Sequence, residues 1–315
     1  MADSTINITN LSSNNTTTLT YNENGKIATT DGIMTYKYVK GTTTLYRKII
    51  WKDGNFRQYD ENGEQVGEVY TKNHYNFQYL LSRAKSGGTL TIRFYHGTFR
   101  VYGPYRIYGN TTILAPSNDV IFEKMRSIYL FINTDDESAK AYDFTRGYYA
   151  GSGNIKIDGI QFEMKNLNSQ IGKFIHGTGF TISNCTVKNG KFDSHVFEFT
   201  SLKNVKVQNC VFQDLKVGWT EKSTDKVWEV LQIESATEKG FPYCLYSKYG
   251  YVQRCNGVTV SSCTFKNVTI AIGNHSTSSS ADNYQSNIVV SNCDFDGAKK
   301  EKKVQFSDLT KVTFK

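Results

Sequence analysis

A repeated segment in the C-terminal half constrains the fold of this chain more than any other feature. Each copy places apolar residues at alternate positions and closes with a small or polar residue before the next apolar one. The first apolar residue of each copy is Ile155, Phe180, Val205, Val258, Ile288 or Val312. The intervals are 25, 25, 53, 30 and 24 residues (180−155, 205−180, 258−205, 288−258 and 312−288), and we interpret the 53 as two coils with a few extra residues.

Stacking of the copies explains this pattern. Alternating apolar residues predict short strands that turn one face inward. One coil cannot bury its own apolar face, but coils stacked at the strand spacing of about 4.8 Å share a continuous core. The Asn or Ser before the inward residue fits a tight corner with a left-handed backbone. The repeat therefore predicts an all-β fold, a single-stranded right-handed parallel β-helix.

The residues before the repeat predict three further parts. Residues 1–18 are rich in Ser, Thr and Asn and predict a flexible arm, and residues 19–70 predict a small β-rich N-terminal module. The β-helix is then expected to occupy 71–315. The apolar pattern at 71–86, closed by Gly87 and Gly88, predicts a short capping helix at its start.

Charge and hydropathy restrict the partners. The net charge is +8, but the Lys and Arg residues are scattered rather than gathered in a stripe, so we predict no nucleic-acid partner. No run of about 18 apolar residues exists, so we predict no membrane partner. A bacterial surface polysaccharide or a related one, which can be anionic, is the partner that we expect.

The cysteines fit the repeat rather than a metal site. Four of them occupy the same repeat position and should form a buried column that behaves as small apolar residues, namely Cys185, Cys210, Cys263 and Cys293. Zinc ligands would come in C-x-x-C pairs, and the sequence has none. The state of Cys244 and Cys255 is left open.

Aligning the strand before each copy brings polar residues together. Residues 196–200, 230–234 and 271–275 align, which predicts two outward columns on one wall of the helix. The first column would hold Glu198, Gln232 and Gly273, with Gly273 leaving an open floor. The second column would hold Thr200, Glu234 and His275, extended one coil by His176, with His195 and Glu229 just upstream on the same wall.

Paired carboxylates on one wall suit glycoside cleavage, because one can protonate the leaving oxygen while the other acts as base or nucleophile. Glu198 and Glu234 are the first catalytic candidates and Glu229 is the next, with His195 and His275 assisting. Taken singly, an outward Glu or His on a solenoid is more often an ordinary solvated residue. The hypothesis therefore depends on the cluster.

Long insertions should emerge beside this wall, because insertions in repeat proteins form loops over one face. Aromatic rings in such loops can stack on sugars, or they can simply pack the loops onto the helix. The substrate-binding candidates are Gln232, His176, Trp228, Tyr243, Tyr246, Tyr249, Tyr251 and Tyr284.

Over residues 71–315 the chain resembles the pectate-lyase-like right-handed β-helix proteins of Gram-positive bacteria and their phages. The family's Glu-Ala-Ile-Gln-Ile-Asp run is matched by residues 229–234, its Phe-Pro by 241–242 and its Ile-Gly-x-His by 272–275. The entry from a helix into Gly-Gly, Gly-Thr-Phe at 97–99 and residues 110–113 match the opening coils. The family's Asp is Glu234 here.

The resemblance implies a protein that meets polysaccharide outside the cell or on a virion. The leading hypothesis is a hydrolase that needs no cofactor. A polysaccharide lyase is an alternative that would use calcium. The alternative of another class is a non-catalytic receptor-binding or structural module of a phage tail, in which a homotrimer would be common.

Overall fold

The structure is a computed structural model. It describes residues 5–9, 16–20, 32–52, 55–67, 73–117, 119–133, 153–168, 170–192, 195–217, 229–235, 254–274, 285–297, 303–306 and 309–315.

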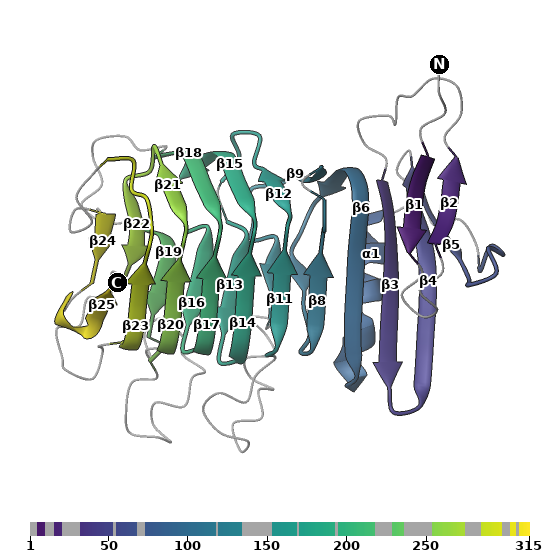
Figure 1. The fold of residues 1–315 in the computed structure, drawn as a ribbon, viewed down its shortest axis with the longest axis horizontal. Helices are drawn as coiled ribbons and strands as arrows, with labels where there is room; N and C mark the ends of the chain where they lie inside the picture. Colours follow the sequence, from purple (N-terminus) through teal and green to yellow (C-terminus); the bar gives the residue numbers. More distant parts are fainter. Residues whose placement is uncertain are drawn as a thin grey trace.

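Parallel strands stack along one long axis and form three walls (Figure 1). The first wall contains β8 (Thr111–Leu114), β11 (Ile155–Asp158), β14 (Thr178–Ser183), β17 (Lys203–Gln208), β20 (Asn256–Ser261), β23 (Ser286–Ser291) and β25 (Val312–Phe314). The second wall contains β9 (Val120–Lys124), β12 (Gln161–Glu163), β15 (Thr186–Phe192), β18 (Val211–Val217) and β21 (Thr264–Lys266). The third wall contains β7 (Tyr105–Arg106), β10 (Phe131–Ile132), β13 (Gly172–Ile175), β16 (Phe197–Thr200), β19 (Glu229–Glu234), β22 (Ile270–Gly273) and β24 (Val304–Gln305). The predicted right-handed parallel β-helix is confirmed.

The register of the first wall follows the repeat. The first apolar residue of each copy pairs with that of the next, from Ile155 through Phe180 and on to Val312. Val205 pairs directly with Val258. The interval of 53 residues is therefore one long coil, and our interpretation as two coils is wrong. Along the sequence, the added residues lie before and after β19.

The predicted corners have the expected backbone. Asn184, Asn209, Ser262 and Asn292 stand between the first and second walls with φ of 53°, 55°, 52° and 50°. A short side chain that can hydrogen-bond nearby groups lowers the cost of this left-handed conformation. Gly159 occupies the same position in an earlier coil with φ of 77°.

The cysteine column is confirmed. Cys185, Cys210 and Cys263 are buried, Cys293 is partly buried, and all four are free thiols. Each Sγ lies near a carbonyl oxygen of the preceding coil, as in the 3.7 Å contact from Cys210 to Ile182. The free thiol of Cys255 is also buried. Cys244 lies outside the described residues.

The capping helix is confirmed as well. Helix α1 (Asn73–Leu81) continues into the 3-10 turn η1 (Ser82–Ser86), and Gly87 and Gly88 follow with φ of 84° and 96°. Phe77 on α1 packs edge-on against Tyr105 and Phe94, with ring centroids 4.9 and 6.0 Å apart. The helix therefore closes the apolar core of the first coils. No helix in the described part of the chain is long and apolar enough to cross a membrane.

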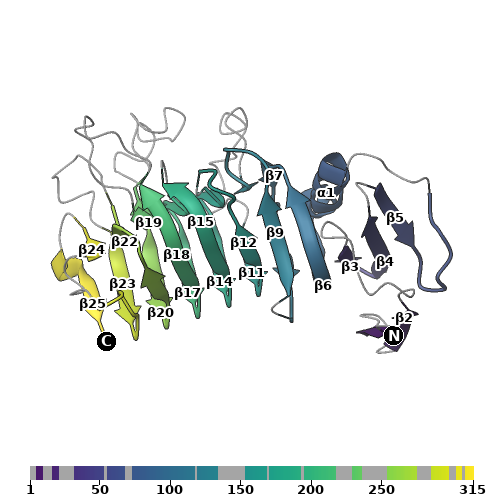
Figure 2. The same ribbon diagram turned by 90° about the horizontal axis from the view of Figure 1, so that it is seen from above.

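Antiparallel strands extend the N-terminal end of the stack (Figure 2). Strand β3 (Gly32–Lys40) pairs with β4 (Thr43–Lys52) and with β6 (Thr89–Val101), and β4 pairs with β5 (Asn55–Tyr59). Strand β6 is long enough to pair with β8 in the first wall and with β9 in the second. The side chains of β3 and β4 join the same apolar core as the helix. The residues expected as a module at 19–70 thus share a sheet with the β-helix.

Two strands pair in and just beyond the segment 1–18 that is expected to be a flexible arm. They are β1 (Thr5–Thr9) and β2 (Thr16–Thr20), which form an antiparallel ladder from Thr5 opposite Thr20 to Thr9 opposite Thr16. The division of the chain into arm, module and helix stays a prediction.

Candidate functional site

The two predicted polar columns lie on the third wall. Glu198 on β16 pairs with Gln232 on β19, which pairs with Gly273 on β22, and Thr200 pairs with Glu234. Phe197 and Phe199 alternate with Glu198 and Thr200 and point into the core, where their rings stack 5.9 Å apart. The predicted register of both columns is confirmed between β16 and β19.

Glu198 sits in a polar cluster that sequence reasoning missed in part. Lys173 on β13 pairs with Glu198, and its Nζ lies 3.7 Å from Oε1. The hydroxyl of Tyr129 donates a hydrogen bond of 2.5 Å to Oε2, and Lys173 Nζ lies 5.6 Å from the centroid of its ring. Extending the strand alignment by one coil would have found Lys173. Tyr129 precedes β10 in a segment without a repeat signal.

His176 does not extend the second column as predicted. Ile175 is the residue that pairs with Thr200, and His176 follows the end of β13 with φ of 54°. The alignment was wrong by one position, because His176 belongs to the corner and not to the strand. Its side chain is only 5% exposed, and this burial lowers the pKa of the imidazole to about 4.

His195 and Glu229 are enclosed rather than displayed on the outer surface of the wall. His195 Nδ1 lies 3.3 Å from Glu229 Oε2 and 3.1 Å from the Glu229 carbonyl oxygen. His195 is 4% exposed and Glu229 is fully buried. The prediction that Glu229 belongs to the catalytic face of the wall is corrected, because a bound substrate could not reach this buried side chain. The contact between His195 and Glu229 can instead hold β16 and β19 in place relative to each other.

Gly273 does not leave an open floor. A Cβ built on Gly273 would lie 2.1 Å from the carbonyl oxygen of Gln305 and 3.0 Å from Glu229 Cγ. The space beside it is already filled, so the absence of a side chain allows close packing of β19, β22 and β24. That prediction is also corrected.

A small hydrogen-bond network holds Glu234 at the end of β19. Its Oε1 accepts the backbone N–H of Ser235 at 2.9 Å. Ser235 Oγ accepts a hydrogen bond of 2.6 Å from Gln285 Nε2, and Gln285 Oε1 accepts the N–H of Cys255 at 2.6 Å. Gln285 is 2% exposed. The conformation of Glu234 is therefore tied to residues from two later coils.

The remaining site candidates fall outside the described residues. These are His275, Trp228, Tyr243, Tyr246, Tyr249, Tyr251 and Tyr284. Within the described part, no group of three or more His, Cys, Asp or Glu side chains is placed to hold a metal ion.

Comparison with known proteins does not identify the chain. No family model and no curated protein matches it, so the resemblance to the pectate-lyase-like family stays a prediction. A solved protein from Parabacteroides merdae, named provisionally as a glycosyl hydrolase, is 12% identical over 70% of this chain and 89% of its own, with a TM-score of 0.44. The ORF18 protein of Geobacillus virus E2 is 12% identical over 76% of this chain and 48% of its own, with a TM-score of 0.45.

A third solved protein, an iota-carrageenase from A. fortis, is 13% identical over 70% of this chain and 52% of its own, with a TM-score of 0.35. At this level of similarity, none of the three carries an argument about what this chain binds.

Proposed function

We propose that the third wall binds a polysaccharide and cleaves it by hydrolysis, with Glu198 and Glu234 as the catalytic pair. The observation that carries the proposal is that both carboxylates stand on one outward face of neighbouring strands, two positions apart in register. A strand spacing of about 4.8 Å and a rise of about 3.3 Å per residue place their Cα atoms about 8 Å apart. Carboxylates at this spacing can reach the two sides of a glycosidic bond.

The free-energy cost of burying polar side chains on the third wall supports a functional role for this wall. Glu198 is 8% exposed and Gln232 is 4% exposed, although both stand on the outer side of the strands. Burying such groups opposes folding unless they are hydrogen-bonded, and apolar or Thr residues would serve a structural wall equally well. Strongly buried ionisable groups with specific partners are typical of functional sites.

We give the two glutamates different roles. Glu198 accepts a hydrogen bond from the Tyr129 hydroxyl and lies beside the Lys173 ammonium, and we give it the role of base or nucleophile. Glu234 then supplies the proton to the leaving oxygen. His195 and Glu229 act through the backbone of β16 and β19 and do not touch the substrate.

The test is a panel of neutral, uronate-containing and Gram-positive cell-wall polysaccharides, followed by assays of new reducing ends and of the ultraviolet absorbance of unsaturated uronates. Glu198→Gln and Glu234→Gln should each lower the cleavage rate on the order of 10³-fold, as expected for loss of a general acid or base. Glu163→Gln on the second wall is the matched control and should cleave at the wild-type rate. Reducing ends without the absorbance support hydrolysis.

Other outcomes would overturn the proposal. Unsaturated products would replace hydrolysis with a lyase reaction. Binding without any product, unchanged in Glu234→Gln, would leave a receptor-binding module, and a stable trimer in solution would favour that module further.

A further inference from the structure

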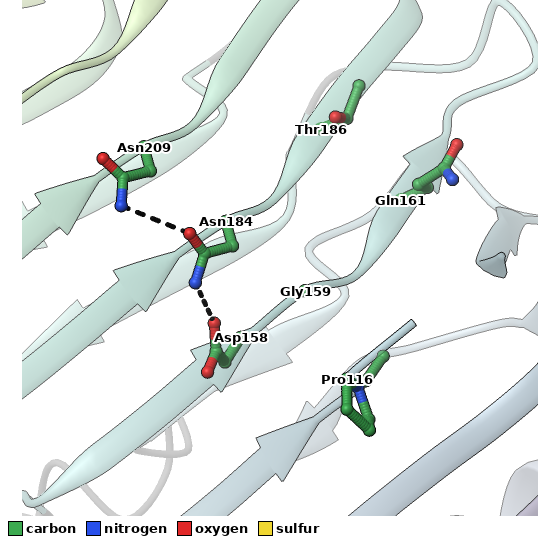
Figure 3. A pocket seen from close by; sticks show the side chains of 8 residues that line it. Pro116, Asp158, Gly159, Gln161, Asn184, Thr186 and Asn209 are labelled. Carbon is green, nitrogen blue, oxygen red and sulfur yellow. Dashed lines mark hydrogen bonds between the residues drawn. The ribbon is translucent and has the colours of Figure 1, made fainter. Parts of the chain in front are cut away.

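A polar groove lies on another face of the helix, where the first and second walls meet (Figure 3). Its volume is about 670 Å³, within the range of small-ligand sites. Asp158, Asn184 and Asn209 form one side, while Gln161 and Thr186 face them from the second wall. The groove contains no residue of the third wall.

The first side is a hydrogen-bonded ladder that runs along the helix axis. Asp158 Oδ1 accepts from Asn184 Nδ2 at 2.7 Å and from Ser183 Oγ at 2.9 Å. Asn184 Oδ1 accepts from Asn209 Nδ2 at 3.3 Å. The next corner residue is Ser262, whose side chain is too short to continue the ladder. Among the described residues, no side chain donates to Asn209 Oδ1.

The ladder leaves donors and acceptors close together at the groove surface. Each amide nitrogen uses one N–H within the ladder and keeps a second, and Thr186 Oγ1 has no partner among the described residues. The only carboxylate in the lining, Asp158, is 2.9 Å from Lys156 Nζ through Oδ2, so its charge is balanced. The groove is thus polar without a net charge.

We propose that this corner groove is a carbohydrate-binding site for neutral glycans, separate from the glutamate wall. A sugar hydroxyl donates and accepts at once, so vicinal hydroxyls match interleaved amide and hydroxyl groups. A neutral lining gives an anionic polymer no compensation for the loss of its hydration. The proposal stands independently of catalysis on the third wall.

The groove is also rigid, which lowers the entropic cost of binding. Its residues stand on paired strands or at corners fixed by left-handed backbone, with φ of 53° at Asn184 and 55° at Asn209. Gly159 forms part of the floor, and a Cβ there would lie 2.0 Å from the carbonyl oxygen of Ala115. The two coils are therefore in direct contact beneath the ligand.

The test is affinity electrophoresis of the full chain in gels that contain dextran, glucomannan, galactan or, as an anionic comparison, alginate. Thr186→Tyr should fill the groove, and Asn209→Gly should remove the amide while keeping the left-handed backbone. In both variants the neutral glycan should no longer retard the protein. This loss corresponds to a rise in Kd of at least about tenfold, the equivalent of about 1.4 kcal/mol.

Matched controls come from the same columns outside the groove. Thr264→Tyr replaces a Thr two coils along in the column of Thr186, and Asn292→Gly replaces a later corner residue with φ of 50°. Both should bind as the wild type does. Wild type that binds no neutral glycan, or groove variants that bind normally, would overturn the proposal.

Discussion

Burial of His176 predicts that the β-helix loses stability in mild acid. The imidazole has a pKa of about 4 in the folded chain, against an ordinary value of 6.5, because burial disfavours its charged form. Between these values the unfolded chain binds a proton that the folded chain does not, so the free energy of unfolding falls as the pH falls. The full effect is about 3 kcal/mol, of which about 2 kcal/mol is lost between about pH 7 and about pH 5.

His176→Asn isolates this contribution. Asn tolerates the left-handed backbone at this position, where φ is 54°, and it does not titrate. Urea unfolding at about pH 7 and about pH 5 should show a loss of stability about 2 kcal/mol larger in the wild type than in the variant. Equal losses in the two proteins would refute the reasoning, because other titrating groups are common to both.

Three further changes probe the packing of the coils. Gly159→Ala should lower the free energy of unfolding in urea by at least about 3 kcal/mol, because its Cβ would meet the Ala115 carbonyl. Gly41→Ala, which has open space around it, should lower that free energy by about 1 kcal/mol. Lys124→Met should lower the free energy of unfolding in urea by about 3 kcal/mol, because the buried ammonium donates hydrogen bonds to three oxygen atoms of residues 168 and 170. In a Cys244→Ser, Cys293→Ser background the remaining native thiols should resist an aromatic disulfide reagent until unfolding, because all four are buried and burial raises the pKa of Cys255 to about 12. Rapid reaction of the native protein would contradict this.

The fold could be predicted because the repeat encodes register directly. Alternating apolar residues fix which side of each strand faces the core, and the corner residue fixes where the chain turns. The spacing of Ile155, Phe180 and Val205 is therefore enough to predict the ladder that these residues form. The length of the long coil could not be predicted in this way, because a spacing alone does not distinguish two coils from one coil with insertions.

The candidate site was predicted less completely, for reasons of local geometry. Strand alignment found Glu198, Gln232 and Glu234, which follow the period of the wall. It misplaced His176 because the period ends at the corner after β13. Tyr129 comes from a connection outside the repeat, and only three-dimensional packing brings its hydroxyl to Glu198.

The irregularities of the repeat converge on the third wall. On the first wall, outward residues such as Thr181, Lys206 and Thr259 are partly or fully exposed, as expected for a solvated sheet. On the third wall the equivalent residues Glu198 and Gln232 are buried, and the added residues of the long coil enter directly before and after β19. A solenoid that served only as a spacer would need neither feature, because regular coils bury the same core with fewer residues and without enclosed charges. The departures from the repeat, rather than the repeat itself, therefore mark the face on which a function should be sought.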